Sequence, residues 1–358
     1  MFTINTEDAV KLAAWYDDNK RELPWRDTGD AYDVWLSEIM LQQTRIEAVR
    51  PKFLLFKQEL PNIEAVATCH EDKLMRIWEG LGYYSRARNL QKCAKVLCER
   101  YDGQLPKDYE ALLKLPGIGP YTAGAIASIA FGIPVPAVDG NVLRVLARLQ
   151  ADYRDVKNPS VRKEATQEVR TLFMQNSDPH FVSSFNQGIM ELGETVCIPN
   201  GTPSCEICPL RVSCRAHATG MVDDLPYRSA PKERKTIERT LFIIRDGSKF
   251  LLHKRKKTGL LAGLYEFIGV DEKISKQEAI ARCQTNGIDV LRIRTLPTAK
   301  HMFTHLTWDM SAYEIMTGQL AEPDDPNYVL TSKKELAHLA VPSAFKTYID
   351  FYALRDHS

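Results

Sequence analysis

Residues 115–141 read LPGIGPYTAGAIASIAFGIPVPAVDGN, and this stretch decides the fold. Its first five residues predict a tight turn between two helices, because Gly117 and Gly119 allow positive φ and leave the backbone uncovered by side chains. Successive N–H groups in such a turn, followed by a helix N-terminus, form a concavity that fits a phosphate. A turn that only connects two helices is the alternative.

A small, apolar and therefore buried helix is predicted from Tyr121 to about Phe131, before Pro134 and Pro136 interrupt the pattern. The next turn, VDGN at 138–141, carries a carboxylate and an amide at the start of another helix. Asp139 could act only as the N-cap of that helix, a role that Asn fills about equally well. Helix N-terminal N–H groups favour a carboxylate over its neutral acid, so we expect Asp139 to remain ionised.

LPGIGPYTA followed by VDGNV resembles the helix-hairpin-helix and the catalytic aspartate of the endonuclease III superfamily of DNA glycosylases. The resemblance implies that Gly117 and Gly119 contact the DNA backbone. It also implies that Asp139 stabilises a positively charged sugar while Asn141 orients this carboxylate or the attacking water. Bifunctional members carry a lysine where this chain has Tyr121, and that lysine forms a Schiff base. Tyr121 therefore points to a monofunctional enzyme that uses water.

Composition limits the possible classes of protein but does not identify the function. The 358 residues suffice for two or three domains, and 44% hydrophobic with 26% charged residues is typical of a globular protein. Residues 1–230 hold 27 basic against 30 acidic side chains, and the remainder holds 20 against 16. DNA binding would therefore rely on local basic patches and backbone amides. No signal peptide opens the sequence, and no apolar run is long enough to span a membrane.

Glu38 lies within a helical pattern predicted over residues 32–48, YDVWLSEIMLQQTRIEA. It could be a solvated residue on an amphipathic helix. Among Trp35, Ile39 and Leu41, its carboxyl would instead have a raised pKa, as a general acid requires. The run SEIMLQQTR resembles the MutY-type adenine glycosylases. The resemblance implies that Glu38 is the acid, that Gln43 and Thr44 lie beside the mispaired base, and that Leu41 and Ile46 contact the substrate.

Other motifs match the same family in the same order. LPWR at 23–26, GLGYYSRARNL at 80–90 and FNQGIMELG at 185–193 are the matching segments. By resemblance, Trp25 and Arg26 border the base pocket, while Leu81 and Tyr83 wedge into the duplex beside Arg86, which contacts phosphate. Glu191 either lines the adenine pocket or is a solvated helix residue.

Four of the eight cysteines are clustered, with seven, two and five residues between Cys197, Cys205, Cys208 and Cys214. Four thiolates with one close pair suit tetrahedral zinc or an iron–sulfur cubane, and spacing alone does not choose between them. Their position resembles the 4Fe-4S loop of the superfamily, although the first gap is one residue longer than usual and lacks Lys and Arg. We expect Arg211 and Arg215 to supply the missing charge.

The C-terminal part has a different character. Residues 227–239 are polar and contain Pro231, which predicts a linker. Strands are predicted around Asp246-Gly247, and residues 260–270, LLAGLYEFIGV, resemble the start of a Nudix domain. The segment 275–287 lacks the carboxylate row that binds magnesium in Nudix hydrolases. By resemblance to MutY, Phe303, Thr304 and His305 would read the oxidised guanine, with Thr304 in place of a serine.

The sequence is thus identified as a member of the MutY-type adenine glycosylases. We expect a multidomain chain with an all-α helix-hairpin-helix glycosylase core over 1–226 and an α+β Nudix-like domain over 240–358. The core would comprise a six-helix module at about 30–136 and a cluster lobe formed by 1–29 with 137–226. The implied partner is double-stranded DNA containing A:8-oxoguanine or A:G pairs, and the implied cofactor is a 4Fe-4S cluster.

The family further implies a monomer that acts in the bacterial cytoplasm, on the nucleoid, without contacting a membrane. Three rival functions remain open. A bifunctional endonuclease III-like glycosylase/lyase is opposed by Tyr121. A non-catalytic iron–sulfur DNA-binding protein is opposed by the pair Glu38 and Asp139. A nucleotide pyrophosphatase is opposed by the missing Nudix carboxylates.

Overall fold

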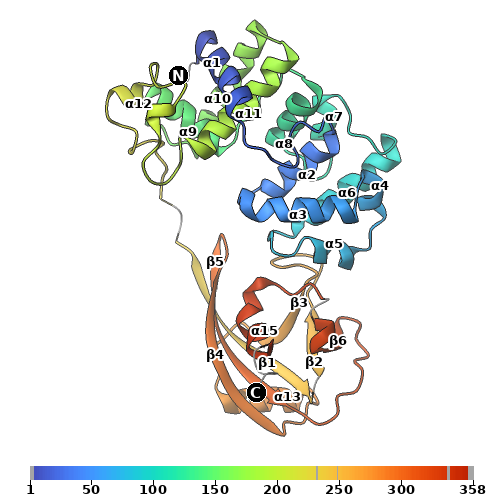
Figure 1. The fold of residues 1–358 in the computed structure, drawn as a ribbon. Helices are drawn as coiled ribbons and strands as arrows, with labels where there is room; N and C mark the ends of the chain where they lie inside the picture. The colour runs from blue at the N-terminus through green and yellow to red at the C-terminus, as the bar shows by residue number, and fades with distance from the viewer. Residues whose placement is uncertain (1–3, 231–232, 248, 337–338, 354–358) are drawn as a thin grey trace. The chain divides into compact units, whose positions relative to one another are not determined.

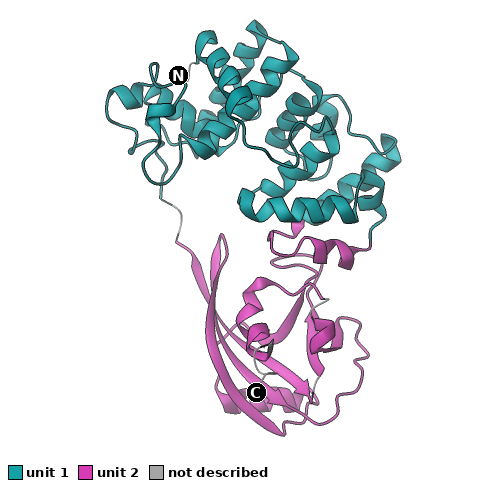
Figure 2. Ribbon diagram, in the orientation of Figure 1, with its two compact units in different colours: residues 1–69, 86–230 teal, residues 70–85, 231–358 magenta. Residues whose placement is uncertain are grey.

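The computed structural model describes residues 4–230, 233–247, 249–336 and 339–353. The chain divides into two compact units (Figure 2). Unit 1 comprises residues 1–69 and 86–230, and unit 2 comprises residues 70–85 and 231–358. The expected linker, 227–239, includes Pro231 and Lys232, which lie outside the described residues.

Unit 1 is built from helices (Figure 1). They are α1 (Thr6–Asn19), α2 (Ala31–Leu41), α3 (Ile46–Glu59), α4 (Ile63–Thr68), α6 (Ser85–Arg100), α7 (Tyr109–Leu113), α8 (Pro120–Ala125), α9 (Gly140–Gln150), α10 (Pro159–Gln175), α11 (Pro179–Thr195) and α12 (Arg215–Ala218). Side-chain oxygens of Asn5, Asp30, Asp108 and Asp178 accept from first-turn N–H groups and begin four of them. The all-α core expected from the sequence is confirmed.

One hydrophobic core joins the first helix to the late helices of unit 1. Leu12 of α1, Val145 of α9, Val169 of α10 and Phe185 of α11 are all buried in it. The apolar stripe of α1 therefore packs against segments more than a hundred residues away. Partly buried cysteines of the 197–214 cluster lie against the same core.

The helix expected over residues 32–48 is in fact two helices. α2 ends at Leu41, and α3 begins at Ile46 after a turn in which Gln43 has φ +57°. Arg86 of α6 explains the break, because its guanidinium donates to the carbonyl oxygens of Ile39, Met40 and Gln42 at 2.6–2.9 Å. These carbonyls would otherwise lack partners at a helix C-terminus.

The helix predicted from Tyr121 to Phe131 is also divided, since a π-helical segment, η1 (Ile126–Ala130), follows α8 directly. Ser128 donates from Oγ to the Gly124 carbonyl at 2.7 Å. A Cβ at Gly124 would lie 2.2 Å from the carbonyl oxygen of Pro136. Glycine thus lets this buried segment approach the irregular segment that precedes Asp139.

Unit 2 contains a six-stranded mixed sheet in the order β4-β5-β1-β3-β2-β6. The strands are β1 (Lys235–Asp246), β2 (Lys249–Lys254), β3 (Tyr265–Val270), β4 (Arg292–Met302), β5 (Leu306–Met316) and β6 (Tyr328–Ser332). The unit's helices are α5 (Glu71–Ile77), α13 (Lys276–Thr285), α14 (Lys333–Leu336) and α15 (Lys346–Ala353), with a 3-10 turn at Ser343–Phe345. The hairpin predicted at Asp246-Gly247 is present, with Asp246 paired to Lys249.

Successive residues of β1 contribute alternately to two hydrophobic cores, one on each face of the sheet. Leu241 and Ile243 pack with Tyr348 of α15, whereas Phe242 and Ile244 pack with the α13 side. One helix therefore covers each face of the sheet, as period-two alternation requires. β1 begins at Lys235, inside the segment expected to be linker, because residues 235–245 pair in parallel with β5.

Among the described residues, no helix combines the length and hydropathy that a bilayer-spanning segment requires.

Candidate active site

A cleft of about 1090 Å³ lies within unit 1 and gathers most of the residues predicted for catalysis and base recognition. They come from the loop before α2, from α2 and the turn after it, and from α8, α9 and α11. Those lining it are Trp25, Arg26, Glu38, Leu41, Gln43, Thr44, Ile46, Tyr121, Asp139, Asn141 and Glu191. Segments up to about 170 residues apart thus converge on one cavity large enough for a nucleotide.

Glu38 is a buried carboxyl on α2, with 8% of its surface exposed. Burial, aided by the nearby Asp139 charge, raises the pKa of Glu38 to about 7 against the opposing effects of the Tyr121 hydroxyl and Arg26. At neutral pH an appreciable fraction of Glu38 is therefore protonated, which is the condition a general acid must meet.

Asp139 is the N-cap of α9 and also faces the cleft. Its Oδ1 accepts from the backbone N–H groups of Asn141 at 2.8 Å and Val142 at 2.9 Å. Burial raises the pKa of Asp139 from its ordinary value, while these two N–H groups lower it. The helix N–H groups thus favour the ionised form as expected, although desolvation outweighs their effect on the pKa, and the ionised state of Asp139 stays a prediction.

Asn141 connects the turn at residues 138–141 to the neighbouring helices through hydrogen bonds. Its Nδ2 donates to Asp139 Oδ2 at 2.9 Å, and its Oδ1 accepts from Arg144 Nη2 at 2.8 Å. Arg144 also donates to the carbonyl oxygens of Gly193 at 2.7 Å and Cys197 at 2.8 Å. The Asp139 carboxylate is thereby connected by hydrogen bonds to the end of α11 and to the first clustered cysteine.

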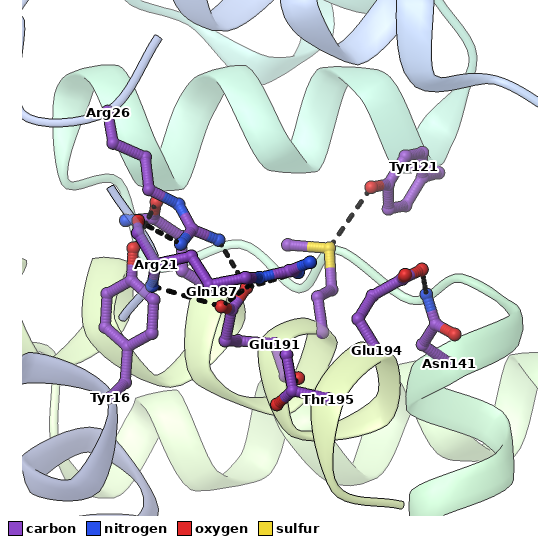
Figure 3. A network of polar contacts seen from close by, with 10 residues as sticks. Tyr16, Arg21, Arg26, Tyr121, Asn141, Gln187, Glu191, Glu194 and Thr195 are labelled. Atoms are coloured by element: carbon purple, nitrogen blue, oxygen red, sulfur yellow. Dashed lines mark hydrogen bonds and ion pairs between the residues drawn. The ribbon is translucent and has the colours of Figure 1, made fainter. Parts of the chain in front are cut away.

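Tyr121 lies at the N-terminus of α8, and its hydroxyl donates to the Met190 sulfur at 3.1 Å (Figure 3). Burial raises the pKa of Tyr121 well above its ordinary value, and the adjacent Glu38 and Asp139 carboxylates add to this rise. The phenol therefore stays neutral and can act as a hydrogen-bond donor beside both acids.

Glu191 is not a solvated helix residue, since only 1% of its surface is exposed. Arg21 donates to it from Nε at 2.6 Å and from Nη2 at 2.9 Å, and Arg26 donates from Nη2 at 2.6 Å (Figure 3). Burial by itself would raise the pKa of Glu191, but the two guanidinium groups together lower it to about 2. The cleft thus contains one permanently ionised carboxylate besides the two catalytic candidates.

Trp25 and Arg26 hold fixed positions at the cleft. Trp25 packs edge-on against Phe53 with ring centroids 5.3 Å apart. The Arg26 guanidinium lies 5.4 Å from the centre of the Tyr16 ring, and Tyr16 itself donates to Gln187 at 2.7 Å. The LPWR segment is therefore anchored on α1 and α11 rather than exposed on a mobile loop.

The hairpin turn before α8 has one glycine in the left-handed region, Gly117 at φ +78°. Gly119 is the N-cap of α8 with φ −93°, so it does not adopt the positive φ that glycine allows. A Cβ at Gly117 would lie 2.7 Å from Asn89 Cβ, whereas one at Gly119 would meet nothing within 4 Å. Gly119 therefore leaves the α8 N-terminus open to an approaching phosphate.

Two residues expected at the DNA surface are buried instead. Leu81 is 4% exposed and Arg86 is 7% exposed, and Arg86 uses its guanidinium on α2 carbonyls and on Thr44 Oγ1 at 3.0 Å. Both side chains are covered in this structure, and the wedge role of Leu81 and the phosphate contact of Arg86 stay predictions. Tyr83, by contrast, is 45% exposed and has φ +44°.

The predicted lesion-reading residues lie at the turn between β4 and β5 of unit 2. Thr304 and His305 are exposed, and within this unit Thr304 Oγ1 lies 2.5 Å from the Tyr83 hydroxyl. Phe303 is partly buried and packs on Trp308 with ring centroids 4.9 Å apart, and its contact with the oxidised guanine stays a prediction. Phe303 therefore anchors the turn between β4 and β5 to the core.

The four clustered cysteines line one small cavity together with Arg148 and His217. Arg148 Nη1 donates to Cys197 Sγ at 3.3 Å. Burial raises the pKa of the Cys208 thiol to about 12 and also raises the pKa of Cys205 and Cys214. Within the described part of the chain, no three His, Cys, Asp or Glu side chains converge closely enough to hold a single metal ion.

Several residues that shape the cleft were not assigned from the sequence. Arg21 and Met190 contact Glu191 and Tyr121, and Arg162 of α10 donates to the carbonyl oxygen of Val138 at 2.6 Å. Glu194 also lines the cleft, and its spacing of three from Glu191 on a helix was a usable signal. Arg162 offered none, since its partner is a backbone carbonyl.

Residues 36–171 match the model of the HhH-GPD superfamily base excision DNA repair protein, and residues 240–351 match the NUDIX domain. Among solved structures, a thermostable thymine-DNA glycosylase shares 26% identity with a TM-score of 0.51, covering 59% of this chain and 95% of that one. A trapped endonuclease III–DNA covalent intermediate shares 25% identity with a TM-score of 0.50, covering 61% and 100%. Fold and site together define a DNA glycosylase of the helix-hairpin-helix superfamily with a C-terminal NUDIX domain.

Relatives that align over two thirds or more of this chain identify its family within the DNA glycosylases. Adenine DNA glycosylase of Mus musculus is 33% identical over 97% of this chain and 77% of its own length. The Homo sapiens enzyme is 32% identical over 95% and 73%, and that of Mycolicibacterium smegmatis is 36% identical over 67% and 80%. The chain belongs to the MutY-type adenine DNA glycosylase family and is a DNA glycosylase of base excision repair.

The Arg21–Glu191 pair generates a prediction about stability. Substitution Arg21→Met should lower the free energy of unfolding by about 2 kcal/mol, because a buried carboxylate loses its bidentate partner while the partly exposed Arg21 moderates the loss. Urea denaturation at pH 7 measures it. Lys11→Met, which breaks the solvent-exposed Lys11–Glu7 pair, is the matched control and should leave the unfolding midpoint unchanged. Equal effects of the two substitutions would contradict the prediction.

Proposed function

We propose that this glycosylase hydrolyses the N-glycosidic bond of adenine paired with 8-oxoguanine or guanine in double-stranded DNA, and that it has no lyase step. The observation that carries the proposal is the pair Glu38 and Asp139 in one cleft, with the pKa of Glu38 at about 7. Two carboxyl groups in different environments are what cleavage of a glycosidic bond requires.

The proposed chemistry divides between the two acids. Protonated Glu38 gives its proton to adenine, at N7, while the bond from N9 to the sugar breaks and its electron pair leaves with the base. Asp139 faces the resulting positive charge on the sugar. Water then adds to the sugar carbon and loses a proton, which leaves an abasic site and free adenine. Asn141 orients the Asp139 carboxylate for this step.

The absence of a lyase step rests on Tyr121. Lysine at this position would offer an amine to the sugar, whereas a phenol whose pKa is raised well above its ordinary value offers no comparable nucleophile. Tyr121 is therefore assigned to hydrogen bonding with the substrate beside Glu38.

Adenine recognition is assigned to the permanently ionised Glu191 and its guanidinium partner Arg26 at the cleft wall. An anionic oxygen accepts from the exocyclic amine of adenine, and indole and guanidinium planes such as those of Trp25 and Arg26 suit a flipped purine. The turn at Thr304 and His305 is assigned to the oxidised guanine, since both side chains are exposed and hydrogen-bonding.

The clustered cysteines suit an iron–sulfur cubane, because all four line one cavity against the core of α9 and α11 and the family resemblance places such a cluster there. We assign Cys197, Cys205, Cys208 and Cys214 to a 4Fe-4S cluster, which would hold the 197–214 segment to this lobe. Arg148, beside Cys197 Sγ, would offset thiolate charge.

Single-turnover assays with excess protein test the proposed function as a whole. Adenine should be excised rapidly from A:8-oxoguanine, more slowly from A:G, and not measurably from A:T duplexes. Strand cleavage should appear only after alkali, and borohydride should trap no covalent complex. Thymine glycol excision with a borohydride-trapped adduct would instead establish a bifunctional glycosylase.

Glu38→Gln should bind the mispaired duplex yet excise adenine roughly 10²–10⁴-fold more slowly, because the amide has no proton to donate at neutral pH. For the wild type, kcat/KM should fall as pH rises through about 7, since the neutral acid is lost there. An excision rate for Glu38→Gln near that of the wild type would remove Glu38 from the mechanism.

Asp139→Asn separates catalysis from helix capping. Asn caps a helix about as well as Asp, so the melting temperature should change little. The single-turnover rate should nevertheless fall by roughly 10²–10³-fold, because a charge in a dry site is worth several kcal/mol to the transition state. A rate within a few-fold of the wild type would leave Asp139 as a cap only.

Purified protein should be yellow-brown and contain about four irons per chain, as the four-cysteine assignment requires. Metal analysis and visible absorption measure this directly. Cys208→Ser should lose colour and DNA binding together. One zinc per colourless chain would overturn the cluster assignment.

A further inference from the structure

Both N–H donors and the carbonyl oxygen of the Asn141 side-chain amide have hydrogen-bond partners. Nδ2 donates to Asp139 Oδ2 at 2.9 Å and to Glu194 Oε1 at 3.0 Å, while Oδ1 accepts from Arg144 Nη2 at 2.8 Å (Figure 3 shows the Glu194 contact). An amide has two N–H donors and one carbonyl oxygen. Reversing it would turn the oxygen toward two carboxylates and the NH₂ toward a guanidinium, so the partners define one orientation.

Close helix packing brings Glu194 to this amide. Gly193 lies so near α9 that a Cβ there would be 2.7 Å from Asn141 Cβ. The Gly193 carbonyl accepts from Arg144, so the end of α11 is held against the catalytic turn and the next residue reaches Asn141. Glu194 is exposed and lines the same cleft as Glu38 and Asp139.

A carboxylate in this place opposes DNA binding, because it adds negative charge to a cleft that must receive a phosphate backbone. It also adds little to the stability of the free protein, since exposed charged contacts are weak. Glu194 therefore needs a role that appears once DNA fills the cleft and excludes water, when its hydrogen bond to Asn141 strengthens.

We propose that Glu194 is a positioning residue for glycosidic bond cleavage: it holds the Asn141 amide so that the other N–H group remains directed at Asp139. This inference rests on the proposed adenine excision. It predicts that loss of Glu194 slows chemistry in the bound complex without weakening binding.

Glu194→Ala should lower the single-turnover rate on A:8-oxoguanine duplex roughly five- to tenfold, the scale of one typical intramolecular hydrogen bond. Its Kd for a duplex with a non-cleavable adenine analogue should be equal or tighter, because a negative charge is removed. Glu194→Gln should recover most of the rate, since its carbonyl oxygen can accept the same N–H. Glu47→Ala is the matched control and should leave the rate unchanged, because Glu47 is an exposed carboxylate that lines the same cleft but is not a partner of the Asn141 amide.

A double-mutant cycle tests whether the effect passes through Asn141. Adding Glu194→Ala to Asn141→Ala should cost no further rate, whereas independent roles would give additive losses. The proposal is overturned by an unchanged rate in Glu194→Ala, by Glu194→Gln as slow as Ala, by additivity, or by a fall in melting temperature that accounts for the lost activity. A wild type that excises thymine glycol but leaves adenine intact would reject the proposed function itself, and this inference with it.

Discussion

Three N–H groups converge on the carboxylate of Asp139, and the arrangement of the cleft depends on that convergence. Two belong to the backbone at the start of α9 and the third to Asn141. Because α9 is buried in the core shared by α1, α10 and α11, the turn is as fixed as that core. Arg144 extends the attachment to Gly193 and Cys197.

The second constraint is that two buried carboxyl groups share one cleft. Burial raises the pKa of both, and the charge of Asp139 raises that of Glu38 further. One proton shared between such groups resides on the more desolvated one, while the donors on Asp139 favour its ionised form. The assignment of acid and counter-charge thus follows from what surrounds each carboxyl. Glu191 does not compete for the proton, because Arg21 and Arg26 lower its pKa.

Much of this arrangement was predictable because local signals determine it. The Gly117 turn, the Asp139 cap and the buried Glu38 each depend on a few neighbouring residues. Features set by distant partners were missed. α2 ends at Leu41 because Arg86, more than 40 residues away, reaches its carbonyls. The burial of Glu191 similarly depends on Arg21, 170 residues away, which no periodicity of α11 reveals.

The bond between the Tyr121 hydroxyl and the Met190 sulfur has a consequence for how a base enters. A thioether is a weak acceptor, so Tyr121 loses little when that bond breaks, whereas a nitrogen or oxygen partner would have to be displaced at greater cost. The hydroxyl also interacts with the Glu38 carboxyl, so an acceptor that enters the cleft would have to displace only the weaker contact, the one with the sulfur. Met190 in this way keeps the donor oriented without competing for it.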